Sequence, residues 1–151
     1  MQLDFNVENI NEIRFELHPL ITDLAEEFGV DLSLNWGMYI ELQRLSEYMA
    51  FTARHDGELV GYAGFCIAWN TPHVKEESAA VCDVIYLKPA YRKGLNGVRF
   101  IRHIEKVLLD HDDGIDTLLI HSRKDISNLR ALLGKMGYDE IEVVHMKRRK
   151  D

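Results

Sequence analysis

A loop rich in glycine and basic residues holds the clearest chemistry in this sequence. It spans residues 87–98 and reads Leu-Lys-Pro-Ala-Tyr-Arg-Lys-Gly-Leu-Asn-Gly-Val. Gly94 and Gly97 let the backbone come close to a ligand. The first amides of the helix expected after the loop lack partners within that helix and attract anions. Because Arg92 and Lys93 add positive charge, the loop predicts a phosphate-binding site between a strand and a helix.

The order of the glycines excludes two common phosphate-binding motifs. No Gly-Lys-Ser or Gly-Lys-Thr follows, as it would in a P-loop, and Gly-x-Gly-x-x-Gly is absent. The loop and the helix after it are nevertheless basic in a chain whose net charge is -7. A local basic cluster in an acidic protein indicates a local anionic ligand, although a solvated helix face gives the same pattern.

Asp83 is the candidate for acid–base chemistry. It is the only charged residue between Ser78 and Leu87, within an apolar segment that is expected to form a strand. A carboxylate in such a segment costs free energy unless it has a partner or a function. It can take a proton from a reacting group. The alternative is a carboxylate that points to solvent or bonds a loop for structural reasons.

The patterning of apolar residues predicts the elements that must position these groups. The expected strands cover residues 3–7, 49–54, 58–68, 79–87, 117–121 and 140–147. The expected helices cover residues 10–28, 35–47, 98–108 and 126–136. Pro19 predicts a kink or two abutting helices within the first of these. Asp56-Gly57 predicts the turn of a β-hairpin.

These elements define an α/β fold with a mixed sheet, in the order β-α-α-β-β-β-α-β-α-β. A hairpin leads into a strand-loop-helix-strand crossover, which predicts a right-handed parallel unit and helices on both faces of the sheet. A length of 151 residues fits a single domain over residues 1–151, with a basic tail at residues 147–151.

Composition restricts the class of protein further. No apolar run approaches the roughly 20 residues that span a bilayer, and the N-terminus lacks the pattern of a signal peptide. Cys66 and Cys82 lie in apolar runs and are expected to be reduced core residues of a cytoplasmic protein. The acidic surplus disfavours nucleic acid as a partner. His103 and His111 are spaced too far apart on one helix to gather metal ligands, so no metal site is expected.

The loop resembles motif A of the GNAT family of N-acetyltransferases, usually Val-x-Pro-x-x-Arg-Gly-x-Gly-x-Gly/Ala. The matching positions are Leu87, Pro89, Tyr91, Arg92 and Gly97. The sequence departs from the motif where its first glycine falls on Leu95, while Gly94 stands one place early.

Other segments carry the same resemblance. Glu58-Leu59-Val60-Gly61-Tyr62 resembles the family strand that follows a hairpin, and Ser127-Asn128 through Gly137-Tyr138 resembles motif B. The order of elements is similar to that of the family from about Leu3 to Lys147. The segments around His73, Asp83 to Pro89 and Glu105 resemble a subgroup frequent in bacteriophage genomes.

The resemblance implies an acetyl-CoA cofactor and direct attack of an amine on the thioester. It implies a cofactor site formed by Leu87, Arg92, Lys93, Gly94, Leu95, Asn96, Gly97, Val98 and Asn128. Asp83 would take the proton of the amine, and a backbone amide around Leu87 would stabilise the oxyanion. His73 and Tyr86 would bind the acceptor. Many relatives carry a tyrosine acid on the motif B helix, where this chain has Leu133.

Two other functions stay open. The departures at Leu95 and Leu133 are compatible with a GNAT-fold module that binds CoA or another protein with little or no catalysis. The basic residues of the loop and Lys147–Lys150 are compatible with nucleic-acid binding, which the net charge disfavours. The acceptor expected for the enzyme is a small-molecule or protein amine, with a cationic acceptor favoured. Membrane attachment is not expected, and a homodimer is compatible with the sequence.

Overall fold

The computed structural model describes residues 1–70, 76–110, 114–123 and 127–150. The chain forms two compact units, Met1–His121 and Ser122–Asp151.

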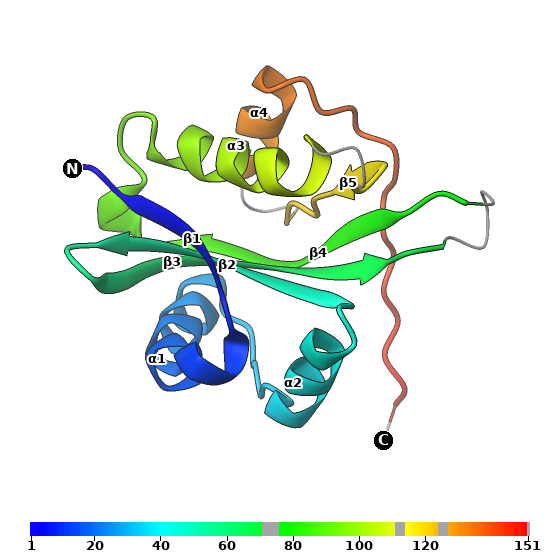
Figure 1. The fold of residues 1–151 in the computed structure, drawn as a ribbon, viewed down its shortest axis with the longest axis horizontal. Coiled ribbons are helices and arrows are strands. Elements are labelled where there is room, and N and C mark those ends of the chain that lie inside the picture. Colours follow the sequence, from blue (N-terminus) through cyan, green and yellow to red (C-terminus); the bar gives the residue numbers. More distant parts are fainter. Residues whose placement is uncertain (71–75, 111–113, 124–126, 151) are drawn as a thin grey trace. The chain divides into compact units, whose positions relative to one another are not determined.

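The first unit is built on a single mixed sheet (Figure 1). Its strands are β1 (Asp4–Glu8), β2 (Tyr48–His55), β3 (Glu58–Ala68), β4 (Ala79–Leu87) and β5 (Thr117–Leu119). They lie in the order β1-β2-β3-β4-β5, in which neighbours from β1 to β4 are antiparallel. β4 and β5 are parallel, which confirms the predicted mixed sheet and its crossover pair.

Helices cover both faces of this sheet, as predicted. α1 (Ile10–Phe28) and α2 (Trp36–Arg44) lie on one face, and α3 (Asn96–Leu109) lies on the other (Figure 1). α1 buries one apolar stripe against the sheet, formed by Ile10, Ile13, Leu17, Leu20, Ile21 and Leu24. The opposite face packs Phe51 and Phe65 of the sheet against Phe100, Ile104 and Leu108 of α3.

The hairpin between β2 and β3 forms where the sequence predicts it. Asp56 and Gly57 have φ angles of 48° and 84°. Two successive left-handed residues make the turn that matches the twist of antiparallel strands. Glycine is needed at the second of these positions because its φ angle is far from the range that other residues adopt readily.

The first helix differs from its prediction. α1 runs without interruption from Ile10 to Phe28, although Pro19 was expected to kink or divide it. Pro19 lies on the exposed side of the helix. The carbonyl of Phe15, which loses its helical donor there, can therefore bond to water instead.

The second unit contains α4 (Ser127–Lys135), close to the helix expected over residues 126–136. Gly137, with a φ angle of 91°, follows the end of this helix. Residues 140–147 form no strand, although their alternation predicted one. Ile141 and Val143 are 68% and 82% exposed, so the alternating residues bury no face. A strand gains stability from cross-strand packing and burial, and alternation alone does not supply either.

Candidate functional site

The edge of β4 opens where β5 ends. β4 pairs with β5 only from Ala79 to Val81, opposite Thr117 to Leu119, and then continues to Leu87. Among the described residues no strand pairs with this edge of β4 beyond Val81. Backbone groups at such an edge are available to a ligand, and ligands of open α/β sheets bind where neighbouring strands part at their carboxyl ends.

Asp83 lies at a β-bulge in β4. Cys82 pairs with Phe65 and Val84 pairs with Gly64, so Asp83 has no partner on β3. The bulge also shifts the alternation of side chains along β4 by one residue. Cys82 packs on the α3 side of the sheet before the bulge, and Ile85, three positions later, packs there after it. Asp83 is exposed as a result. Bulges are over-represented beside active sites because they redirect a side chain in this way.

A tyrosine from α2 bonds the Asp83 carboxylate. The hydroxyl of Tyr39 donates to Oδ2 of Asp83 at 2.7 Å. The Tyr39 ring stands edge-on to Tyr48 at 5.0 Å, and the hydroxyls of Tyr48 and Tyr62 lie 2.5 Å apart. Burial raises the pKa of Tyr39, and the neighbouring Asp83 raises it further. The Tyr39 hydroxyl therefore stays protonated and remains a donor at neutral pH.

The loop after β4 is shaped by bonds of its own backbone and of Asn96. The amide of Lys88 donates to the carbonyl of Val60 at 2.9 Å, which keeps the start of the loop on the sheet. Pro89–Tyr91 form a single 3-10 turn. Nδ2 of the buried Asn96 donates to the carbonyl of Tyr91 at 3.0 Å. Asn96, predicted to contact the cofactor, thus ties the end of the loop to this turn.

The N-terminus of α3 is left open by the residue that precedes it. Leu95 occupies the N-cap position and forms no capping hydrogen bond, whereas Asn9 and Asn35 cap α1 and α2 with their side chains. A Cβ atom at Gly94 would meet no atom within 4 Å beyond the residues adjacent in the chain. The first amides of α3 therefore receive no side-chain cap from Leu95, and the exposed Lys93 precedes them in the loop. This arrangement fits a phosphate-bearing group.

Arg92 and Tyr86, both predicted to bind ligands, have partners within the protein. Arg92 donates through Nε to the carbonyl of Leu87 at 2.6 Å and through its two terminal nitrogens to Glu27 at 2.5 and 2.8 Å. The hydroxyl of the buried Tyr86 donates to Glu27 at 2.9 Å. These bonds fasten the loop to α1. The predicted contacts of Arg92 with the cofactor and of Tyr86 with the acceptor would have to compete with them.

Replacing Glu27 with glutamine should reveal this link as an acid-sensitive contribution to stability. Arg92 holds the pKa of Glu27 below its ordinary range through its hydrogen bonds. A lowered pKa stabilises the native state above the ordinary value of about 4.3, and the contribution is lost as pH falls through the native-state pKa. The free energy of unfolding of wild type should exceed that of Glu27→Gln by less than about 1 kcal/mol at neutral pH, since the side chains of Arg92 and Glu27 are both partly exposed.

The measurement is thermal unfolding of both proteins from pH 7 to pH 3, with Glu26→Gln as the control on the same helix. The difference between wild type and Glu27→Gln should shrink below about pH 4.3, while Glu26→Gln should follow wild type. A difference for Glu27→Gln that stays constant down to pH 3 would contradict the ion pair with Arg92.

The other predicted site residues are divided between the two units. Leu87 is buried at the end of β4, and Gly97 and Val98 lie in the first turn of α3. Asn128 is exposed near the start of α4 in the second unit. His73, predicted to bind the acceptor, lies outside the described residues. The ligand contacts of all these residues stay predictions.

Sequence reasoning missed Glu27 as the partner of Arg92 and Tyr39 as the partner of Asp83. The first pair is separated by 65 positions and the second by 44. One of two adjacent glutamates near a helix end, and a tyrosine in an apolar stripe, carry no local signal of such contacts. Only the packing of α1 and α2 on the sheet brings them to β4 and its loop.

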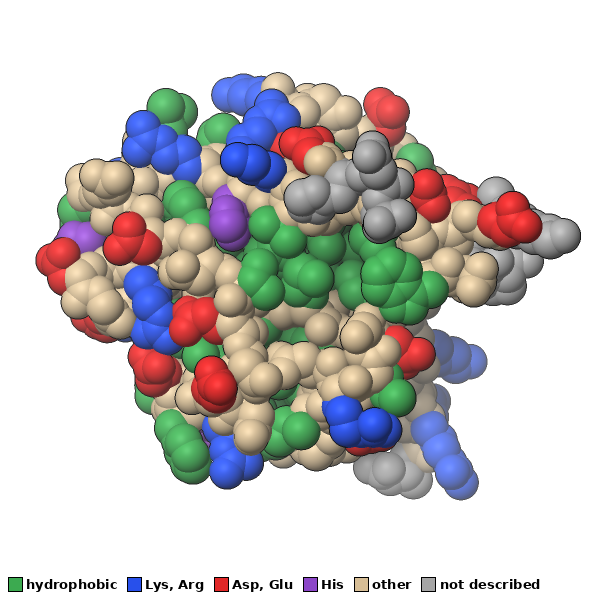
Figure 2. All heavy atoms as spheres, viewed as in Figure 1, with side chains coloured by type: hydrophobic (Ala, Val, Ile, Leu, Met, Phe, Trp, Pro, Cys, Tyr) green, Lys and Arg blue, Asp and Glu red, His purple; other side chains and the backbone are tan. Residues whose placement is uncertain are grey.

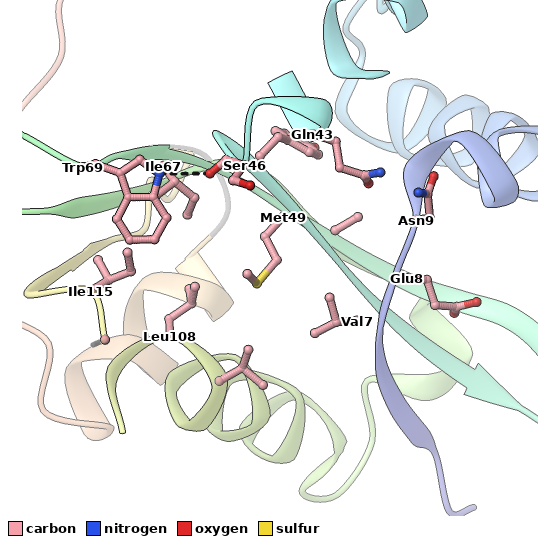
Figure 3. Close-up of a pocket in the computed structure, with 14 residues that line it drawn as sticks. Val7, Glu8, Asn9, Gln43, Ser46, Met49, Ile67, Trp69, Leu108 and Ile115 are labelled. Atoms are coloured by element: carbon pink, nitrogen blue, oxygen red, sulfur yellow. Dashed lines mark hydrogen bonds between the residues drawn. The ribbon is translucent and has the colours of Figure 1, made fainter. Parts of the chain in front are cut away.

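A cavity of about 440 Å³ lies elsewhere in the first unit (Figure 3). Apolar side chains line most of it, among them Val7, Met49, Ile67, Trp69, Leu108 and Ile115. Trp69 is anchored there by a 3.1 Å hydrogen bond from its ring nitrogen to the carbonyl of Ser46. Apolar side chains gather in the middle of the face seen in Figure 2. None of the predicted site residues lines the cavity, so the candidate site is the one formed by β4, α2 and the loop before α3.

The described part of the chain offers neither a metal-binding cluster nor a membrane-spanning helix. It contains no group of three or more histidine, cysteine, aspartate or glutamate side chains that could hold a metal ion. None of its helices is both long enough and apolar enough to cross a membrane.

Residues 11–138 match the profile of the acetyltransferase (GNAT) family. This match covers most of the chain, so the protein belongs to the GNAT acetyltransferase family. A search of curated proteins gives no match.

Solved structures of acetyltransferases share the fold. A ribosomal-protein-alanine N-acetyltransferase from Brucella melitensis biovar Abortus 2308 has a TM-score of 0.74 at 18% identity, covering 99% of this chain and 100% of that chain. An aminoglycoside acetyltransferase from an uncultured soil metagenomic sample, in complex with sisomicin, has a TM-score of 0.76 at 14% identity, covering 99% and 97%. A predicted acetyltransferase from Clostridium acetobutylicum, with acetyl-CoA, has a TM-score of 0.73 at 12% identity, covering 97% and 96%.

Proposed function

We propose that this protein is an acetyl-CoA-dependent N-acetyltransferase that transfers the acetyl group to a primary amine by direct attack in a ternary complex. The observation that carries the proposal is the placement of two features on one strand-loop-helix segment. Asp83 stands exposed on the open edge of β4, and the same segment leads to the uncapped N-terminus of α3. An anion site and a proton acceptor are the two groups that this reaction needs from the protein.

The loop and the first turn of α3 would hold the cofactor. Their amides and Lys93 suit the pyrophosphate of acetyl-CoA, which supplies a thioester carrying the acetyl group when bound. Asn96 and Arg92 keep the loop in shape through their bonds to the carbonyls of Tyr91 and Leu87. Holding both reactants in one orientation is the main contribution that the chain makes to such a transfer.

The open edge of β4 would serve the chemical step. A backbone amide around Leu87 would donate to the thioester oxygen as negative charge develops on it. Asp83 would accept the proton of the attacking amine, directly or through a water molecule. The net charge of -7 and the aminoglycoside complex of one structural relative favour a cationic amine as the acceptor.

A second candidate function is a GNAT-fold module that binds CoA or another protein without efficient catalysis. Leu95, 60% exposed, stands where the family motif has a glycine, and Leu133 stands where many relatives have a tyrosine. Neither residue can donate or accept a proton. This candidate predicts cofactor binding without turnover.

One experiment distinguishes the two candidate functions. The protein is incubated with acetyl-CoA and a polyamine, an aminoglycoside or a peptide with a free N-terminus, and free thiol is measured over time. We expect thiol release that depends on one class of amine, with the acetylated amine found by mass spectrometry. Binding of acetyl-CoA without thiol release for any amine would favour the non-catalytic module.

A further inference from the structure

The position of α2 depends on few contacts. None of its residues is fully buried, and its apolar side chains Trp36, Tyr39, Ile40 and Leu42 are only partly covered. Gln43 on this helix accepts a hydrogen bond from the backbone amide of Ile10 at 2.7 Å, and Tyr39 donates the bond that reaches Asp83 on β4. The same bond therefore connects the helix to the carboxylate proposed as the base.

This bond occupies only one oxygen of the carboxylate. Oδ2 of Asp83 accepts from Tyr39 at 2.7 Å, and no other described residue donates to the side chain of Asp83. An exposed aspartate on a bulge can otherwise rotate among several positions. With Oδ2 held, Oδ1 remains the oxygen that can accept from an amine or from a water molecule.

The donor is itself held in place by packing. Tyr39 lies edge-on against Tyr48 with ring centroids 5.0 Å apart, and Tyr48 is buried with its hydroxyl on that of Tyr62. Because burial and Asp83 raise the pKa of Tyr39, the hydroxyl cannot release its proton near neutral pH and does not compete as a base. It acts only as a donor to the carboxylate.

We infer that Tyr39 is a positioning residue of the reaction, fixing Asp83 so that its second oxygen receives the proton of the acceptor amine. The inference rests on the proposed function, in which Asp83 is the base. It also gives α2 a part in the reaction, because any displacement of this helix would move the carboxylate. A hydrogen bond to a charged group changes an equilibrium constant by about tenfold to a hundredfold, and the lower figure suits this partly exposed pair.

Tyr39→Phe should lower kcat about tenfold and leave the KM for acetyl-CoA within about twofold. The ring and its packing stay, while the bond to Asp83 is lost. Tyr48→Phe is the matched control, because it keeps the ring that packs against Tyr39 and removes only the hydroxyl that bonds Tyr62. Its kcat should stay near that of wild type even though its stability falls. Equal losses of kcat in both variants would assign Tyr39 a purely structural role and overturn the inference.

A double-mutant cycle separates this inference from the proposed function. If Tyr39 acts through Asp83, Tyr39→Phe should cause no further loss of kcat in the Asp83→Asn background. A full additional tenfold loss there would overturn the inference alone. Failure of Asp83→Asn to lower kcat would instead refute the proposed base, and with it the inference.

Hydrogen exchange gives a readout that does not depend on activity. The amides of α2 should exchange faster in Tyr39→Phe than in Tyr48→Phe, because only the former releases the helix from β4. Unchanged protection of α2 in Tyr39→Phe would show that the bond does not hold the helix and would contradict the inference.

Discussion

Asp83→Asn is expected to lower kcat about 100-fold while leaving the affinity for acetyl-CoA within about twofold, the usual effect of removing a general base. Asparagine keeps the size of the side chain, and its amide oxygen can still accept the hydrogen bond of Tyr39. What it loses is the capacity to take a proton at neutral pH. The change therefore removes the proposed chemistry and keeps the contact between β4 and α2.

The control for this variant is Asp4→Asn, the same replacement at an exposed position on β1, the edge strand opposite β5. Steady-state kinetics with a saturating amine would give kcat, and isothermal titration would give the affinity for acetyl-CoA. Asp4→Asn should match wild type in both. If Asp83→Asn also matches wild type in kcat on a true acceptor, Asp83 has a structural role only, as a partner of Tyr39.

The parts of the site that could be predicted from the sequence are those that depend on neighbouring residues. Gly94 and the helix that follows it define the open N-terminus of α3 within a few positions, and the Asp56-Gly57 turn needs only its two flanking strands. Asp83 could be singled out as a lone charge in an apolar run, although its exposure in the structure removes the cost of burial and its catalytic role stays a prediction. Local sequence carries each of these signals.

The rest of the site depends on contacts between distant segments. The bulge at Asp83 is visible only in the pairing of β4 with β3, because the apolar residues on either side of it look like one continuous strand. The bonds of Arg92 to Glu27 and of Asp83 to Tyr39 require α1 and α2 to pack on the sheet. Local pattern could not supply these pairs.

The geometry of the loop explains how the chain departs from the family motif at Leu95. Gly94 has a φ angle of 65°, a left-handed conformation that favours glycine. Leu95 has a φ angle of -100°, which any residue adopts, and its side chain is 60% exposed. The loop thus has its glycine where the backbone turns, one place earlier than in the motif, and the Leu95 side chain is largely exposed to solvent.

Gly97→Glu is expected to abolish the stabilisation of the protein by acetyl-CoA. Wild type should gain about 2.7 kcal/mol at a concentration 100-fold above Kd, which corresponds to an increase in Tm of about 5–10 °C. Gly97 is the second residue of α3, directly beside the amides proposed to hold the pyrophosphate. A glutamate there adds bulk and a negative charge where the proposed ligand is itself negative. Thermal unfolding at increasing concentrations of acetyl-CoA gives the measurement.

Gly37→Glu provides a matched control, because Gly37 is the second residue of α2 just as Gly97 is of α3. Glutamate near a helix N-terminus interacts favourably with the helix dipole, so neither variant should lose its helix. A Cβ atom at Gly37 would meet only the Asn35 side chain, at 3.7 Å. Gly37→Glu should therefore keep the full increase in Tm with acetyl-CoA, while Gly97→Glu loses it. If both variants respond as wild type does, acetyl-CoA does not bind at the N-terminus of α3, and the assignment of the cofactor site fails.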